Sequence, residues 1–183
     1  MPHLLDKYLF KYEKKEYHKI EINAGVDEIY RSVVNINLKE SFIIKFLFKL
    51  RGLNRLFSWK KSSTDIGLSG FTQNGFILLA EKTNRYIILG LAGKFWTPAG
   101  ALKKMPVSDF VNFNENGFAK AVWSFEISEK NGVNILETET RIHCPDRISR
   151  LKFSIYWTLI RPFSGLIRKE MLRIVKKSAE KSK

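Results

Sequence analysis

Cysteine is almost absent from this sequence: Cys144 stands alone among 183 residues. A single cysteine excludes a disulfide framework and a cluster of thiolate metal ligands. Long apolar runs are also missing, since no stretch of about 20 residues is free of charge, and we therefore expect no membrane-spanning helix. The N-terminus lacks a basic head followed by an apolar run and a cleavage site, which predicts no signal peptide and a cytoplasmic location.

Acidic residues are scarce relative to basic ones, with 18 Asp and Glu against 32 Lys and Arg and a net charge of +14. The excess lies in two segments: residues 39–61 carry +6 and residues 147–183 carry +9, so the remainder carries −1. This separation predicts attraction to an anionic partner. Nucleic acid, an anionic membrane surface and an acidic ligand all fit the charge pattern.

Apolar material is sufficient for a core, because 44% of the residues are hydrophobic and 13% are aromatic. A chain of this length fits one domain, so we treat residues 1–183 as a single unit. The hydrophobic periodicity and the turn residues predict strands, two short helices after the first strand, a loop with a short helix, and a long final helix. The expected strands cover residues 17–23, 76–82, 85–96, 107–113, 118–128 and 133–144, and the expected helices begin after Gly25, cover residues 39–51, and run from Asp146 to the end with a kink or break at Pro162.

This order predicts an α+β domain in which a curved antiparallel β-sheet wraps around the long C-terminal helix. Charged residues are rarely buried alone, so Lys120, Glu126, Glu137, Glu139 and Arg141 mark the outer face of their strands. Lys94 and Glu81 do the same for the two preceding strands. The inner face is then apolar with two threonine hydroxyls. A dry core is the usual role of such a face, and a ligand cavity is the alternative, which periodicity alone does not distinguish.

Three segments carry a resemblance to a known family: GFILLAEKTNRYIILGLAGKFW, ILETETRIHCPD and YWTLIRPFSGLIRKEML. With the element order, they resemble the START-like superfamily, also called SRPBCC or the polyketide cyclase and lipid-transport group, and look most like its small bacterial members of unassigned function. The resemblance covers about residues 17–179. It implies a helix-grip fold with a hydrophobic cavity between the sheet and the last helix.

The resemblance implies that such a cavity binds a lipid, a quinone, a sterol-like molecule or a polyketide. We therefore expect a carrier, sensor or transfer protein without a cofactor, and the alternative is an enzyme of the polyketide cyclase or dehydratase type that uses the same cavity. The strand faces and the helix residues spaced by four select the candidate ligand-binding residues: Phe76, Leu78, Ile87, Leu89, Leu91, Phe95, Trp123, Phe125, Leu136, Thr138, Thr140, Leu151, Ile155 and Leu159.

Candidate catalytic groups are sparse, and we predict no catalytic residue. His143 and Cys144 are adjacent on a strand, so their side chains point to opposite faces and do not form a dyad. Glu137 and Glu139 share a face with Arg141, which favours a solvated ladder of charges over an acid and base pair. Metal-ligand spacings such as HExxH or CxxC are missing, and the sequence predicts no metal site.

Residues 41–61 combine lysine with a large apolar surface. On a helix, Lys45 and Lys49 fall on one stripe, and Phe and Leu cover most of the rest. One interpretation is a helix buried between the sheet and a neighbouring helix; another is a lid that contacts an anionic membrane. Nucleic-acid binding is disfavoured, because Phe and Leu dominate the segment and Lys outnumbers Arg across the chain. The candidate membrane-contact residues of a peripheral association are Phe42, Lys45, Phe46, Lys49, Lys60 and Lys61. We expect the basic end of the C-terminal helix to assist this contact.

Overall fold

The structure is a computed structural model that describes residues 4–36, 68–73, 75–97 and 101–181. The strands are β1 (Lys14–Ile22), β2 (Ile77–Lys82), β3 (Tyr86–Gly93), β4 (Ala119–Lys130) and β5 (Val133–His143). The helices are a short 3-10 helix η1 (Leu4–Lys7) and the α-helices α1 (Val26–Val34), α3 (Leu68–Gln73), α4 (Val107–Asn112) and α5 (Arg147–Lys181). The helix expected over residues 39–51 lies outside the described residues.

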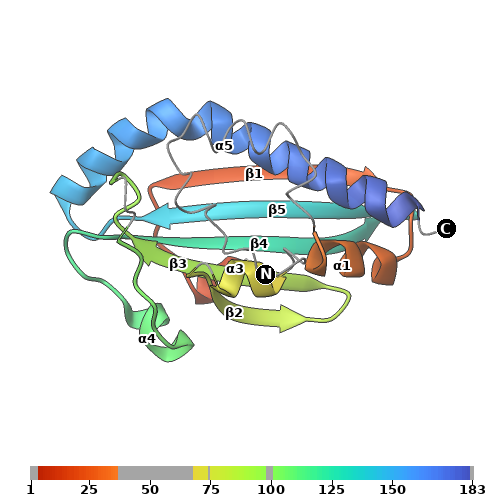
Figure 1. Cartoon of the computed structure of the whole chain (residues 1–183), viewed down its shortest axis with the longest axis horizontal. Coiled ribbons are helices and arrows are strands. Elements are labelled where there is room, and N and C mark those ends of the chain that lie inside the picture. The colour runs from red at the N-terminus through yellow and green to blue at the C-terminus, as the bar shows by residue number, and fades with distance from the viewer. Residues whose placement is uncertain (1–3, 37–67, 74, 98–100, 182–183) are drawn as a thin grey trace.

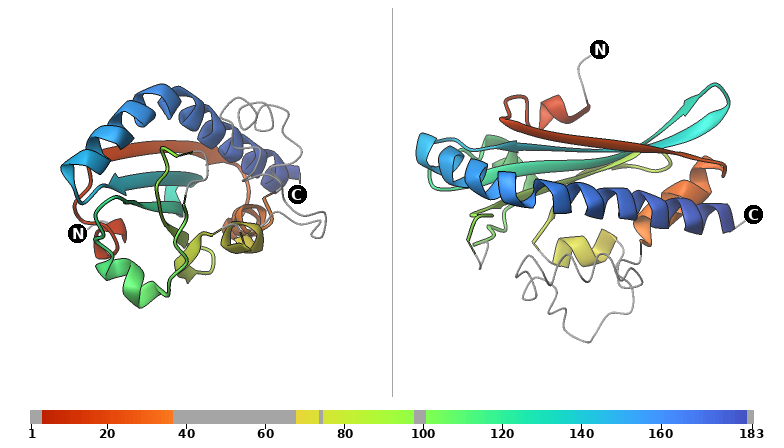
Figure 2. Two further views of the ribbon diagram at one scale, coloured as in Figure 1. Left: turned by 60° about the vertical axis from the view of Figure 1, so that its left-hand side comes forward. Right: turned by 90° about the horizontal axis from the view of Figure 1, so that it is seen from above.

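The strands of the described chain form one antiparallel sheet in the order β1-β5-β4-β3-β2. The sheet is curved, and α5 runs along one face of it (Figure 1; Figure 2). The α+β class and the helix-grip arrangement expected from the sequence are therefore confirmed. We call the face toward α5 the inner face and the opposite face the outer face.

Tight turns fix the register of the hairpins. Asn131 and Gly132 both have positive φ, 54° and 77°, which is the geometry of the type I′ turn that matches the twist of paired strands. They connect β4 to β5, as the Asn-Gly dipeptide predicts. Asn84, with φ 61°, serves the connection between β2 and β3 in a similar way.

The inner face carries the main core, and the strand faces predicted from charge are confirmed for β3, β4 and β5. Ile87, Leu89, Phe125 and Leu136 are buried in one cluster that also receives side chains from α1 and α5. At about 25 cal/mol per Å² of buried apolar surface, side chains of this size each contribute roughly 2 kcal/mol. This cluster fixes α5 across the sheet.

The outer face is covered as well, which the charge pattern did not predict. Leu5, Tyr8 and Leu9 from the N-terminal segment pack with Phe110 against outward side chains of the central strands. Glu139 and Arg141, expected in a solvated ladder, are only 4% and 3% exposed. The Arg141 guanidinium donates to Asp6 at 2.5 Å and to Glu139 at 2.6 Å. The N-terminal segment therefore supplies an acidic partner, Asp6, for the buried arginine.

The segment over residues 107–113, expected to be a strand, contains helix α4. Val107, Phe110 and Val111 follow the i, i+3, i+4 spacing of a helix, and Phe110 is fully buried in the outer cluster. Lys120 holds the end of the helix, because its ammonium donates to the carbonyl oxygens of Phe110 and Val111 at 2.9 and 2.8 Å. The prediction of a strand there was wrong, because the run is too short for alternation to be distinguished from helical spacing.

Strand β2 departs from its predicted alternation at a bulge between Leu78 and Ala80. Phe76 and Leu78 pack with the inner cluster as expected, whereas Ala80 packs with the outer one. Glu81, expected outside, pairs with Ile87 and accepts a hydrogen bond from Tyr30 of α1. One extra residue in the strand therefore reverses every face after it.

Helix α5 is continuous through Pro162 and is bowed along the sheet (Figure 1). The side of α5 that was predicted to face the sheet was wrong. Leu151, Ile155 and Leu159, expected there, are 64%, 61% and 68% exposed. Phe153 and Trp157 face the sheet in their place. Their stripe continues with small or apolar residues to Ala179, so it is the one face of α5 that stays buried over the whole length of the helix.

Candidate functional site

The sheet residues predicted to line a cavity come together between the sheet and α5. Ile87, Leu89, Trp123, Phe125 and Leu136 are buried in the inner cluster, and Phe76 and Leu78 pack beside them. Phe95 belongs to a neighbouring cluster with Phe153, near the start of α5. Contact of these residues with a ligand stays a prediction.

Hydrogen-bonding side chains interrupt this apolar face at its centre. The indole nitrogen of Trp123 donates to the Thr138 hydroxyl at 2.7 Å, and that hydroxyl donates to the Ser124 carbonyl at 2.8 Å. Both hydrogen bonds are buried, which fixes the plane of the Trp123 ring. Thr138 thus acts as a structural bridge between β4 and β5.

Arg168 of α5 reaches across to the same region. Its guanidinium donates to the Thr140 hydroxyl at 2.7 Å and to the Ser164 hydroxyl at 2.9 Å. It also lies 5.3 Å from the centre of the Trp123 ring, a cation–π distance. The sequence alone does not indicate Arg168, because only the observed helix register places it on the side of α5 that faces the sheet.

Strand β1 contributes Glu16 and His18 opposite these threonines. Glu16 pairs with Thr140 and His18 pairs with Thr138 across the sheet. One carboxylate oxygen of Glu16 lies 3.0 Å from His18 Nε2, whereas the other is buried and has no hydrogen-bond partner. The Glu16 side chain is 9% exposed. Glu16 precedes the strand expected over residues 17–23, so the sequence offered no sign that its carboxylate would be covered.

A glycine allows α5 to pass close to this pair. A Cβ atom at Gly165 would lie 2.9 Å from the Glu16 carboxylate, closer than such contacts normally come. We name Glu16, His18, Thr138, Thr140 and Arg168 the inner polar cluster. It offers the carboxylate acceptor of Glu16 within an otherwise apolar surface, a combination typical of small-molecule sites.

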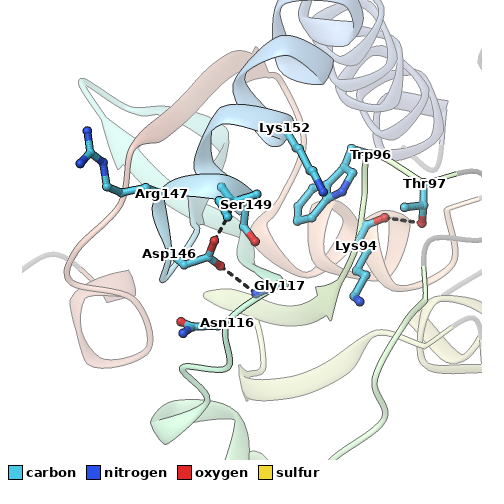
Figure 3. A pocket seen from close by; sticks show the side chains of 10 residues that line it. Lys94, Trp96, Thr97, Asn116, Gly117, Asp146, Arg147, Ser149 and Lys152 are labelled. Atoms are coloured by element: carbon cyan, nitrogen blue, oxygen red, sulfur yellow. Dashed lines mark hydrogen bonds between the residues drawn. The ribbon is translucent and has the colours of Figure 1, made fainter.

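An open pocket of about 700 Å³ lies at the start of α5 (Figure 3). Its cations are Lys94, Arg147 and Lys152. The Asp146 carboxylate is engaged, accepting hydrogen bonds from the backbone nitrogens of Gly117 at 2.7 Å and Ser149 at 2.8 Å, and these hold the pKa of Asp146 well below its usual range. The remaining lining residues are Trp96, Thr97, Asn116, Gly117, Ile148 and Ser149.

The residues considered for acid and base chemistry lie apart from the inner polar cluster. Glu137 accepts a hydrogen bond from Tyr17, and His143 Nδ1 lies 3.1 Å from Glu13. Cys144 is buried, and burial first, then Glu13, raises the pKa of its thiol to about 12. The thiol is therefore protonated at neutral pH and is a poor nucleophile.

The remaining expectations concern a metal site, a membrane-spanning helix and the membrane-contact residues. Among residues 4–36, 68–73, 75–97 and 101–181, no group of His, Cys, Asp and Glu could hold a metal ion. Over those same residues, no helix combines the length and apolar character needed to cross a bilayer. Phe42, Lys45, Phe46, Lys49, Lys60 and Lys61, the expected membrane-contact residues, lie outside the described part of the chain.

Comparison with known proteins finds distant structural similarity to solved proteins. No family model and no curated protein matches the sequence. The solved structure of CalU16 from Micromonospora echinospora is 13% identical with a TM-score of 0.31, and the match covers 91% of this chain and 83% of that one. The solved structure of TTHA0849 from Thermus thermophilus is 7% identical with a TM-score of 0.36, over 92% of this chain and 99% of that one.

Proposed function

We propose that the protein binds a small hydrophobic molecule between α5 and the inner face of the sheet, as a carrier, sensor or transfer protein. The observation that carries the proposal is the Glu16 carboxylate oxygen, which is buried without a hydrogen-bond partner beside an apolar surface. Burying such an atom costs free energy that a purely structural core avoids. A ligand that donates a hydrogen bond removes that cost.

The chemistry of the inner polar cluster narrows the ligand class. One oxygen of the Glu16 carboxylate is an acceptor without a partner, so the ligand combines an apolar body with a hydroxyl or another hydrogen-bond donor. The surrounding Trp123, Phe125 and Leu136 side chains suit the apolar body. Because charge-assisted hydrogen bonds are the strong ones, a donor on the ligand adds about 1.5–3 kcal/mol of interaction.

A cyclase or dehydratase is the second candidate, and one observation favours it. Glu16 and His18 are hydrogen-bonded at 3.0 Å on the inner face, and such a pair is able to accept and return a proton. In that case the ligand pocket and the reaction site coincide. Replacing His18 by Gln would then abolish turnover of a bound polyketide while leaving its affinity almost unchanged.

The first experiment is organic extraction of the purified protein and mass spectrometry of what co-purifies. In parallel, fluorescence titration compares 1-pyrenebutanol with its methyl ether, which has the same apolar body without the donor. We expect the wild type to prefer the alcohol by about tenfold or more, in line with one hydrogen bond to a charged group. Glu16→Met should abolish that preference.

Glu21→Met is the matched control, because Glu21 lies on the same strand and is exposed on the opposite side. It should retain the preference for the alcohol. Equal affinities for alcohol and ether in the wild type, or an undiminished preference in a cooperatively folded Glu16→Met protein, would refute the role of Glu16. Absence of any binding of either probe, together with no co-purifying molecule, would refute the proposed function.

A further inference from the structure

The solvent-facing side of α5 carries an apolar stripe that runs along the first half of the helix. Its members are large aliphatic residues that are at least half exposed. They are Ile148 at 67%, Leu151 at 64%, Ile155 at 61%, Leu159 at 68% and Leu166 at 50%. We call this set the α5 outer stripe.

The geometry of a helix places these residues in one line. Steps of three, four and seven residues return to nearly the same side of an α-helix, and Ile148 and Leu166 lie about 27 Å apart along the axis. The opposite side carries Phe153 and Trp157, which are buried against the sheet. The outer stripe therefore faces away from the domain, as the position of α5 along one side of the molecule indicates (Figure 2). Exposed contiguous apolar surface of this kind marks an interaction site.

Positive charge flanks the stripe. Residues 147–169 contain six basic side chains and no acidic one. Arg147, Lys152, Arg161 and Lys169 are exposed among them. At the start of the helix, the pocket of Figure 3 shares Arg147, Ile148 and Lys152 with this surface and adds Lys94.

We propose that the α5 outer stripe and its flanking cations dock the protein on the surface of an anionic bilayer. An apolar helix face between basic residues is the pattern of helices that lie in a membrane interface. Two other partners fit this surface less well. A second copy of the chain would bring two rows of positive charge together. A nucleic acid would leave the exposed aliphatic side chains without a contact. A bilayer with anionic headgroups satisfies both the cations and the aliphatic residues.

This surface differs from the one expected from the sequence, which placed membrane contact in residues 39–61 with assistance from the basic C-terminal end of the last helix. It also does not depend on the proposed ligand, because the outer stripe and the inner polar cluster lie on different sides of α5. The two proposals can therefore fail separately. Docking through α5 would hold the site between this helix and the sheet next to the bilayer.

Cosedimentation with vesicles tests the proposal, using mixed phosphatidylglycerol and phosphatidylcholine against phosphatidylcholine alone. We expect wild-type binding to the anionic vesicles at low salt and a steep decrease as salt screens the charges. Ile155→Ser with Leu159→Ser should weaken binding by about tenfold or more, since each removes an inserted apolar side chain. Arg147→Glu with Lys152→Glu should weaken it by a similar factor.

The matched controls are Phe10→Ser, which removes a side chain that is 72% exposed outside α5, and Lys130→Glu, at the exposed end of β4. Both should bind vesicles like the wild type. Thermal unfolding and pyrenebutanol binding of the stripe variant should be unchanged, because its substitutions are exposed. Those readouts separate loss of docking from loss of fold or of the ligand site.

Three results would overturn the proposal. The first is no wild-type binding to anionic vesicles at low salt. The second is full binding by the stripe variant combined with loss of binding in Lys45→Glu with Lys49→Glu, which would locate docking in residues 39–61. The third is a wild-type dimer, seen by sedimentation velocity, that the stripe variant converts to monomer without any vesicle binding, which would identify a second copy as the partner.

Discussion

Lys120 shows how the fold changes a residue that the sequence places on the surface. Its position in β4 does point outward, as the charge pattern predicts, but α4 and the N-terminal segment cover that face. Lys120 is 5% exposed, and its ammonium lies 5.0 Å from the centre of the Phe110 ring. Desolvation lowers the pKa of Lys120 from 10.5 to about 8.

This lowered pKa predicts a pH dependence of stability. Between about pH 8 and 10.5 the unfolded chain binds a proton that the folded protein has released, so the free energy of unfolding rises with pH in that window. Lys120 is the cause of this rise, which amounts to roughly 3–4 kcal/mol at 1.36 kcal/mol for each pKa unit. Lys120→Met should lack it.

Urea unfolding at several pH values measures the effect as the difference between wild type and variant. Lys130→Met, an exposed lysine of the same strand, serves as the control and should follow the wild type. A difference between wild type and Lys120→Met that stays constant from about pH 7 to about pH 11 would contradict the argument.

At the scale of the element, α5 has apolar residues on two opposite sides, and only one of them reaches the sheet. Phe153 and Trp157 stack in the core, with ring centres 5.8 Å apart. The competing stripe of Leu151, Ile155 and Leu159 becomes basic beyond Leu166, at Lys169 and Arg173. Burying that stripe over the full helix would bury unpaired charge, which is far more costly than exposing a few leucines.

A pair of substitutions tests this register. Trp157→Ala should lower the free energy of unfolding by about 3–5 kcal/mol, because it leaves a cavity in the core. Leu159→Ala, two residues away on the exposed side, should change it by less than about 0.5 kcal/mol. Chemical denaturation of both variants is the measurement, and comparable losses would show that α5 packs in another register.

At the scale of the whole molecule, the sheet has cores on both faces. Besides the layer formed by α5, η1 and α4 cover the outer face, with Leu5 and Phe110 fully buried there. The ion pairs of Arg141 with Asp6 and Glu139 lie beside this second core. The N-terminal segment is therefore an integral layer of the fold.

Leu5→Ala should reveal that role. We expect a loss of about 2–5 kcal/mol in the free energy of unfolding, typical of a leucine removed from a packed core. Phe10→Ala, in the same segment but 72% exposed, should have almost no effect. Guanidinium unfolding compares the two, and a cooperative transition of unchanged midpoint in Leu5→Ala would show that the outer layer contributes little.

The sequence determined the features that depend on near neighbours along the chain. Alternation and turn chemistry predict the strands that form the sheet, although they also predicted a strand over residues 107–113 that is a helix, and the Asn131-Gly132 turn fixes the pairing of β4 with β5. The inner faces of β3, β4 and β5 follow as well, because an outward charge settles the direction of a strand that has no bulge. The candidate site was predictable to the same extent: Trp123, Phe125, Thr138 and Thr140 meet at the centre of the inner face.

Only the tertiary structure decided the features that depend on distant partners. Asp6 and Arg141 meet across 135 positions, so the burial of Glu139 and Arg141 has no local signal in the sequence. Similarly, α5 covers Glu16 and places Arg168 over Thr140, because packing selects the face of a helix whose two sides are both apolar. The same choice leaves the outer stripe exposed, since a helix that buries one side against a sheet must turn the other away from it.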